Sequence, residues 1–135
     1  LLLNGFAFFA AERFIFRPPA ASYQNTNAIL KLKTADGATI SALYLPQPNS
    51  AFTLIYSHGN GEDLGDIRSR LERLRTLGFA VFAYDYRGYG TSEGFPAERF
   101  AYQDINAAYQ YVTEILKVPA SQIVLYGRSV GSGPS

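Results

Sequence analysis

A serine between two glycines near the C-terminus is the residue best suited to covalent chemistry. The pattern GRSVG at residues 127–131 directly follows an apolar run, residues 123–126. A serine in a sharp strand-to-helix turn adopts a strained backbone, and a Cβ two residues to either side would collide with that turn. Gly127 and Gly131 remove these collisions and leave the Ser129 hydroxyl projecting. The pattern predicts a nucleophile for acyl transfer; the alternative is an incidental serine in a glycine-rich turn.

A second glycine-rich loop could supply the electrostatic part of the same reaction. Residues 57–61, SHGNG, follow another apolar run. Acyl transfer needs two donors aimed at the developing oxyanion, one from the residue after the nucleophile and one from a loop after an earlier strand. We expect the backbone N–H groups of Val130 and Asn60 to be these donors. Asn60 is flanked by residues that let the backbone approach a substrate closely, Gly59 and Gly61.

Other polar side chains near these loops have predicted roles. His58, the only histidine, could act as a general base, but on the oxyanion loop its ring is better placed to brace the backbone by hydrogen bonds. Asp85 and Arg87 follow a further apolar run and are expected to pair and tie down their loop. Asp104 is expected to be a solvated or helix-capping carboxylate.

Hydrophobic periodicity predicts the elements that carry these loops. Period-two alternation around Asp36-Gly37 predicts an antiparallel hairpin over residues 29–45. Short apolar runs are typical of strands buried on both faces, and apolar residues spaced by three and four predict helices. The expected buried strands are 52–56, 79–84 and 123–126, and the expected helices are 64–77 and 96–117. A hairpin followed by β-α-β-α-β predicts an α/β fold with a mostly parallel sheet, whose ligands bind beyond the carboxyl ends of the strands.

Composition argues against several classes of function. Twelve Lys and Arg against eleven Asp and Glu give a net charge of +1, which provides no basic surface for nucleic acid. The absence of Cys removes disulfides and thiolate catalysis, and a single His cannot form a multi-His metal cluster. We therefore expect no nucleic-acid partner, no metal and no cofactor, and the oligomeric state is unreadable.

The first seventeen residues form a separate region. Residues 1–11 are apolar apart from Asn4, and arginines follow at positions 13 and 17. Eleven residues are too few to cross a bilayer, which takes about 20. Residues 1–17 are thus either the end of a membrane anchor with a cytoplasmic catalytic domain, or a short helix docked on a cytoplasmic protein. Residues 18–27, which begin with two prolines, are expected to be a linker.

The remaining residues, 28–135, are expected to be the N-terminal part of one domain. With no Met in 135 residues, we expect a fragment cut just past the nucleophile turn. The strands that flank 123–126 would then be missing, so the apolar side chains of Val124 and Tyr126 should be uncovered.

Three segments in this order resemble the α/β-hydrolase superfamily. They are YSHGNGEDLGDI (56–67), FAYDYRGYGTSEGFPAERFAYQDINAAYQYV (82–112) and IVLYGRSVGSGP (123–134). More narrowly, they are similar to the branch of membrane-associated α/β-hydrolase-domain proteins, some of which are palmitoyl-protein thioesterases. The resemblance implies a serine hydrolase that cleaves an ester, thioester or amide of a small molecule or acylated protein. It also implies that Ser129 is the nucleophile, with Asn60 and Val130 at the oxyanion.

The resemblance also locates what this stretch lacks. In α/β-hydrolases the triad acid and base follow the nucleophile along the chain, so both are expected beyond Ser135. A serine without its base is a weak nucleophile, and we expect residues 1–135 alone to be a poor catalyst.

Three alternatives stay open. One is a catalytically dead α/β-hydrolase scaffold that serves as a binding module, and another is a peptidase of the same fold. The third is a dinucleotide-binding unit, suggested by the glycines of residues 59–65 and by Asp85 at the end of the next apolar run. Its G-x-G-x-x-x-G spacing is one residue too long, and Glu62 and Asp63 would repel a pyrophosphate.

Overall fold

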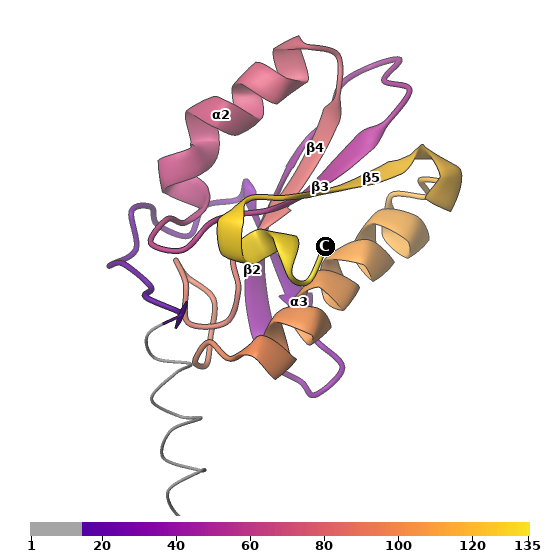
Figure 1. Ribbon diagram of the computed structural model, residues 1–135. Coiled ribbons are helices and arrows are strands. Elements are labelled where there is room, and N and C mark those ends of the chain that lie inside the picture. The colour runs from indigo at the N-terminus through magenta and orange to yellow at the C-terminus, as the bar shows by residue number, and fades with distance from the viewer. Residues whose placement is uncertain (1–14) are drawn as a thin grey trace, which may run out of the picture.

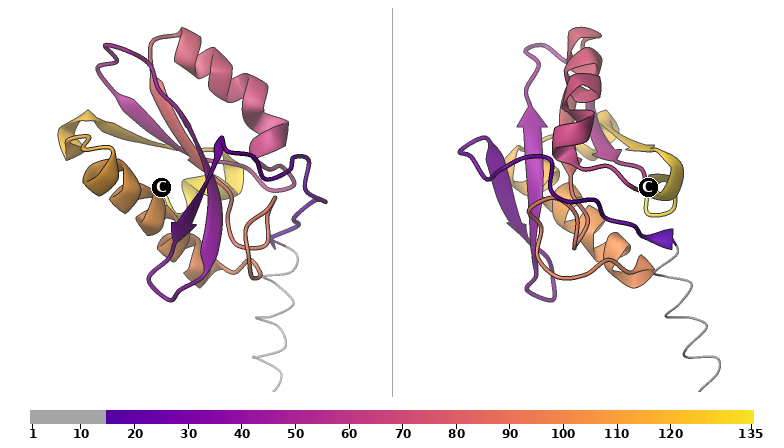
Figure 2. Two further views of the ribbon diagram at one scale, coloured as in Figure 1. Left: turned by 180° about the vertical axis from the view of Figure 1, so that it is seen from behind. Right: turned by 90° about the vertical axis from the view of Figure 1, so that its left-hand side faces the viewer.

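A five-stranded sheet with a long helix on each side makes up the fold (Figure 1). The computed structural model describes residues 15–135. The strands are β1 (Ile29–Lys33), β2 (Thr39–Leu45), β3 (Thr53–Ser57), β4 (Ala80–Tyr84) and β5 (Ile123–Gly127), and the long helices are α2 (Leu64–Thr76) and α3 (Glu98–Gln110). Shorter helical turns cover Tyr111–Ile115, Ala120–Gln122 and Ser129–Ser132. In Figure 1 and the left view of Figure 2, the sheet passes between α2 and α3.

The strand order is β1-β2-β4-β3-β5. β1 and β2 form the predicted antiparallel hairpin, and β2 also runs antiparallel to β4. β3 lies parallel to both of its neighbours, with Ser57 in register with Tyr84 on one side and Gly127 on the other. The α/β prediction is confirmed, and the carboxyl ends of the three parallel strands lie side by side at one edge.

Each face of the sheet has its own apolar core. α2 contributes three buried residues, Leu64, Ile67 and Leu71, to the cluster on one face. α3 contributes alanines and Ile105 to the cluster on the other. Because β3 and β4 lie between these cores, every one of their residues is buried, as predicted.

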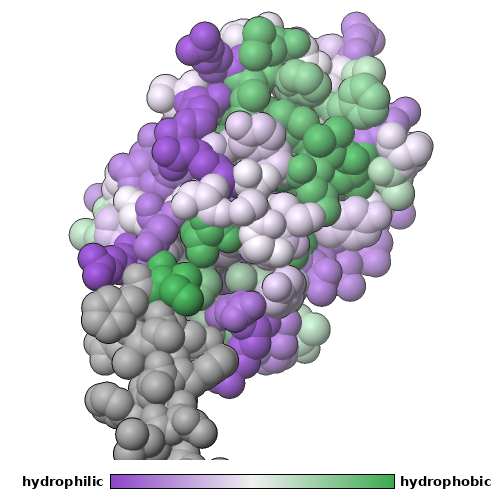
Figure 3. Space-filling model, viewed as in Figure 1, coloured by the Kyte–Doolittle hydropathy of each residue, from purple (hydrophilic) through white to green (hydrophobic). Residues whose placement is uncertain are grey.

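β5 differs from the prediction of a strand buried on both faces. It is an edge strand in this sheet, and Val124, Leu125 and Tyr126 are each about two-fifths exposed, 39%, 43% and 45%. The predicted uncovering of Val124 and Tyr126 is thus observed. Figure 3 shows hydrophobic surface on the side of the molecule that carries this strand. The Tyr126 ring stacks on Tyr56 of β3, with centroids 5.0 Å apart, which helps to hold the edge strand to β3.

The helix ends follow local chemistry. Asp63 caps α2 by accepting from the N–H groups of Gly65 and Asp66, and the Asp66 side chain accepts in return from Asp63 N–H. The helix predicted over 96–117 starts two residues later and changes at Tyr111 into a π turn, in which Leu116 N–H reaches the Tyr111 carbonyl.

The residues before β1 fall into two parts. The prediction of an anchor or docked helix concerns residues 1–17, of which residues 1–14 lie outside the described residues and only Ile15 to Arg17 are described. From residue 15 onward, no helix has the length and apolar character needed to cross a bilayer. Residues 18–27 contain no strand or helix, but Ser22 and Tyr23 bond to Asp63 and Asp85 of the domain.

The predicted pairing of Asp85 with Arg87 is wrong. The loop after β4 turns Arg87 toward α3, where its Nε donates to Asp104 at 2.8 Å and its backbone N–H donates to the same carboxylate at 2.9 Å. A second arm of the guanidinium reaches Asp36 in the β1–β2 turn. The prediction of a solvated or capping Asp104 is also wrong, because its side chain is only 1% exposed. Burial raises the pKa of Asp104, against the opposing effect of the Arg87 hydrogen bonds.

Replacing Arg87 by Leu should strongly destabilise the protein, because it leaves the Asp104 carboxylate buried without its counter-charge. We expect the free energy of unfolding to fall by about 3 kcal/mol or more, measured by chemical denaturation of the full-length protein. The control Arg68→Leu breaks an exposed pair with Glu72 and should cost less than about 1 kcal/mol. Equal losses in the two variants would contradict this account of the Arg87 loop.

Candidate active site

The nucleophile turn is joined to the end of β3 by backbone contacts. The parallel ladder ends with Ser57 opposite Gly127, and Arg128 N–H then donates to the Ser57 carbonyl at 3.0 Å. The turn Ser129–Ser132 follows at once. Ser129 therefore leaves the sheet at the edge where the loop after β3 also begins, as the sequence predicts.

Ser129 has the backbone conformation expected of a serine in a strained turn. Its φ is +54°, in the left-handed region, and the residue is exposed. For a residue with a Cβ, the left-handed conformation costs on the order of 1 kcal/mol. The helix expected after it is a short 3₁₀ turn within the described residues.

Gly127 and Gly131 are where the turn allows no side chain. A Cβ on Gly127 would lie 2.5 Å from both the Gly131 carbonyl oxygen and the Ser132 Cα. A Cβ on Gly131 would lie 2.7 Å from the His58 carbonyl oxygen and closer still to that of Ser57. Because no Cβ contacts of this kind occur in relaxed structures, both glycines are required for the turn to pack on β3.

Ion pairs and a hydrogen bond of Glu62 join the predicted oxyanion loop to the predicted nucleophile turn. Glu62 accepts from Gly59 N–H and from Arg128, both at 2.8 Å, and lies 3.3 Å from Arg70 of α2. Burial acts to raise the pKa of Glu62, but the hydrogen bonds from Gly59, Arg128 and Arg70 outweigh it and lower the pKa. Glu62 thus stays ionised and connects the two loops across 66 residues of sequence.

Asn60 lies between the two glycines of this loop, and Gly61 adopts a φ of +74°. The Asn60 side-chain oxygen accepts from Arg17 N–H at 2.7 Å and from the Tyr89 hydroxyl at 2.8 Å. Within residues 15–135, the backbone N–H groups of Asn60 and Val130 donate to no protein acceptor. The assignment of both N–H groups as oxyanion donors stays a prediction.

His58 is fully buried beneath this loop. Its Nδ1 lies 2.8 Å from the Gly59 carbonyl, which can only accept, so this nitrogen carries the proton. Nε2 lies 3.1 Å from Asp85 Oδ1 without hydrogen-bond alignment. The ring packs between Tyr86 and Tyr89, and the Tyr86 hydroxyl donates to the His58 carbonyl. This placement fits a brace for the loop and not a base that meets substrate.

The sequence did not reveal that Asp85 is a shared hydrogen-bond acceptor for several parts of the chain. Besides lying next to His58, its carboxylate accepts from the Leu64 N–H at 3.0 Å and from the Tyr23 hydroxyl at 2.5 Å. It therefore connects the end of β4, the first residue of α2 and the segment before β1. Tyr23 carried no signal, because its partner is 62 residues away and it lies in a stretch without periodicity.

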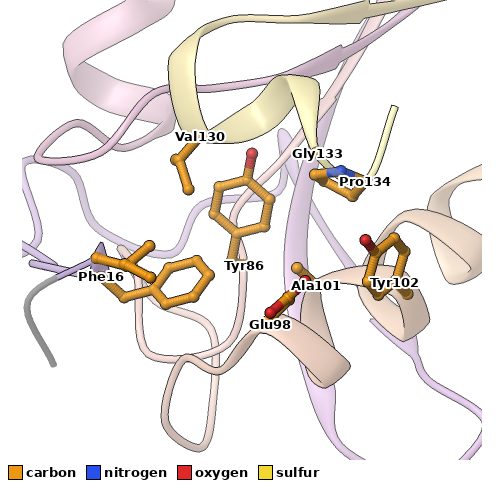
Figure 4. A pocket seen from close by; sticks show the side chains of 9 residues that line it. Phe16, Tyr86, Glu98, Ala101, Tyr102, Val130, Gly133 and Pro134 are labelled. Carbon is orange, nitrogen blue, oxygen red and sulfur yellow. The ribbon is translucent and has the colours of Figure 1, made fainter. Parts of the chain in front are cut away.

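An apolar cavity of about 250 Å³ lies next to Val130. Figure 4 shows Val130 and the Tyr86 ring beside this space, with Phe16 on one side and Tyr102 on the other. The other lining residues are Ile15, Glu98, Ala101, Gly133 and Pro134. Phe16 is 7% exposed, so the segment before β1 supplies a wall of the cavity. The sequence gave no indication that Phe16 would line a cavity.

Residues 48–134 match the family described as serine aminopeptidase, S33. The chain belongs to the α/β-hydrolases. The α/β-hydrolase domain-containing protein aho-3 of Caenorhabditis elegans is 50% identical over 91 residues, covering 67% of this chain and 27% of that protein. The human α/β-hydrolase domain-containing protein 17B is 36% identical over 105 residues, covering 76% of this chain and 36% of that protein. The chain thus spans about a quarter to a third of these relatives' length.

Solved α/β-hydrolases share the architecture. The Pyrococcus furiosus esterase Pf2001 superimposes with a TM-score of 0.73 at 22% identity, over 87% of this chain and 50% of that one, which shows the fold alone. The α/β-hydrolase GrgF from Penicillium sp. sh18 gives a TM-score of 0.67 at 26% identity, over 76% of this chain and 37% of that one. The resemblance to this superfamily is confirmed.

A metal centre would need several ligating side chains close together. No group of three or more His, Cys, Asp or Glu that could hold a metal ion occurs within residues 15–135. Glu62 and Asp63 are both engaged in hydrogen bonds with protein groups. The expectation of no cofactor stays a prediction.

Gly131→Ala should destabilise the full-length α/β-hydrolase by about 2 kcal/mol or more, because the new Cβ meets backbone carbonyls that cannot move aside. Gly133→Ala is the matched control, since its Cβ would lie 3.4 Å from the Val130 carbonyl oxygen and its φ of −65° suits any residue. We expect the control to change the free energy of unfolding by less than about 0.5 kcal/mol. Thermal or chemical unfolding measures both, and a well-tolerated Gly131→Ala would contradict the tight packing of the turn.

Proposed function

We propose that this chain carries the nucleophile and oxyanion hole of a serine hydrolase that cleaves carboxylic esters or thioesters. The observation that supports this most directly is the left-handed backbone of Ser129 at the end of β5. The available N–H groups of Asn60 and Val130 add to it. Asn49 and Lys117 also have a positive φ, but neither follows a strand in a glycine-flanked turn. Backbone strain of this kind clusters at functional sites.

The proposed reaction uses these groups in order. Ser129 Oγ attacks the acyl carbonyl carbon, and the carbonyl oxygen becomes an oxyanion that the Asn60 and Val130 N–H groups stabilise. The C–O or C–S bond then breaks, the alcohol or thiol leaves with a proton, and water hydrolyses the acyl-serine. The proton of Ser129 passes to a base. We assign this base to a histidine elsewhere in the full-length protein, because the buried His58 turns one ring nitrogen to the Gly59 carbonyl and the other to Asp85.

The cavity next to Val130 supports an apolar acyl group as the part of the substrate that is recognised. Its lining from Phe16, Tyr86, Ala101 and Val130 is mainly hydrocarbon and aromatic, and burying a methylene there is worth about 0.8 kcal/mol. An acylated protein or a lipid-like ester would present such a chain. We further propose that the apolar residues 1–11 hold the protein at a membrane surface, where such substrates are found.

A peptidase activity is the second candidate, and one residue favours it. The matching family is described as serine aminopeptidase, and the cavity includes the carboxylate of Glu98. A carboxylate in that position could pair with the ammonium group of a peptide N-terminus. Esters of fatty acids and aminoacyl amides, assayed side by side with the full-length protein, distinguish the two candidates.

Ser129→Ala should abolish labelling by a fluorophosphonate probe and lower ester hydrolysis at least about a thousandfold, because the group that forms the acyl intermediate is gone. Ser121→Ala is the control, since Ser121 is an exposed serine in the turn before β5. Labelling that survives Ser129→Ala would overturn the assignment. A full-length protein that neither reacts nor hydrolyses would instead be a catalytically dead scaffold.

Phe16→Ala should shift the preference for acyl-chain length toward longer chains, because it removes a wall of the cavity. Each further methylene accommodated should raise kcat/KM about fourfold relative to the wild-type profile. The profile compares substrates on one variant, so partial unfolding does not alter it. The control Phe52→Ala removes a phenylalanine outside the cavity that is 44% exposed. An unchanged profile in Phe16→Ala would place the acyl chain elsewhere.

A further inference from the structure

We propose that the segment 16–23, called the strap below, is a positioning element that holds the oxyanion loop in its working conformation. The proposal rests on the proposed function, because it assigns the strap to the loop that carries the Asn60 donor. The strap supplies no reacting group. It contacts the loop and its surroundings at three points, each through a hydrogen bond donated by the strap.

The first contact fixes the middle of the loop. Arg17 N–H donates to the Asn60 side-chain oxygen at 2.7 Å, and the Tyr89 hydroxyl donates to the same oxygen at 2.8 Å. Two donors on one oxygen hold the Asn60 side chain on the strap side of the loop. The adjacent Gly59 and Gly61 give this loop little stiffness of its own, and Gly61 is at a φ of +74°. The direction of the Asn60 N–H therefore depends on an anchor outside the loop.

The second contact fixes the end of the loop. The Ser22 backbone N–H donates to the Asp63 carboxylate at 2.7 Å, and the Ser22 hydroxyl donates to its other oxygen. Asp63 caps α2 with that carboxylate. The strap is thus attached to the residue at which the flexible loop becomes a helix, and Gly65 provides the space, since a Cβ there would lie 3.1 Å from the Tyr23 Cβ.

The third contact supports the loop through Asp85. The Tyr23 hydroxyl donates to Asp85, which also accepts from Leu64 N–H and faces His58. Burial, with the nearby Asp85 charge, raises the pKa of Tyr23 to about 12, so the hydroxyl keeps its proton at neutral pH. Gly90 makes room for this ring, because a Cβ there would lie 2.7 Å from the Tyr23 hydroxyl oxygen.

These contacts predict an effect on turnover rather than on substrate binding. An oxyanion donor acts on the transition state, and removing one costs about a hundredfold or more in kcat. Misaligning one by loosening its support should cost less, about tenfold in kcat, with KM changed less than about twofold. A strap that only stabilised the fold would lower the amount of folded enzyme without this separation of kcat from KM.

The test compares pairs of variants in the full-length protein. Arg17→Pro removes the backbone N–H that reaches Asn60, whereas Arg17→Ala removes only the side chain and keeps that N–H. Tyr23→Phe removes the hydroxyl that reaches Asp85 and keeps the ring; its control is Tyr44→Phe, on β2. For each variant we would measure kcat and KM for an ester, normalised to active sites titrated with a fluorophosphonate. Hydrogen exchange of residues 58–65 gives a readout that needs no activity.

We expect kcat to be about tenfold lower in Arg17→Pro than in Arg17→Ala, and about tenfold lower in Tyr23→Phe than in Tyr44→Phe, with faster exchange in residues 58–65. Unchanged kcat in both test variants overturns the proposal, even if exchange becomes faster. Should Arg17→Pro fail to fold, Tyr23→Phe alone decides. Failure of the proposed function is recognised separately, because Ser129→Ala would then leave the hydrolysis of esters unaffected.

Discussion

The backbone of the turn after β5 packs directly on the carbonyl groups at the end of β3, and the candidate site depends on this contact. Gly131 has no Cβ, so the turn can approach Ser57 and His58 closely. Ser129 then takes its left-handed conformation two residues earlier, beside the loop that follows β3. Any residue with a side chain at position 131 would push the turn, and Ser129 with it, away from the end of β3. The pairing of β3 with β5 and the glycine pattern are thus parts of one geometric requirement.

Three carboxylates lie near the candidate site, and each accepts hydrogen bonds from donors of the protein. Glu62 is held by arginines from two elements, and Asp85 by Tyr23 and Leu64. Burial would raise the pKa of Asp63, but hydrogen bonds from Ser22 and from the start of α2 lower it. The hydrogen bonds keep Glu62 and Asp63 ionised and pair their charges with donors of the protein. Carboxylates paired in this way repel the proposed oxyanion less than three unpaired carboxylates would.

The sequence was sufficient wherever the determinant was local. The buried runs of β3 and β4, the period of α2 and the G-x-S-x-G turn each depend on neighbouring residues, and each was predicted. The same reasoning was wrong for Arg87 and Asp104, because their pairing depends on how the loop after β4 lies against α3. It also gave no indication of the Glu62–Arg128 bridge, the Tyr23–Asp85 bond or the wall formed by Phe16. Partners 62 or 66 residues apart leave no periodic signal in one sequence.

The strap enters the domain at the same edge from which Ser129 projects. Ile15 and Phe16 line the cavity together with Val130, so the chain that precedes the strap starts beside the cavity. The described part of the chain thus begins at the end of the sheet that carries Ser129, and a wall of the cavity comes from Phe16, which belongs to no strand or helix.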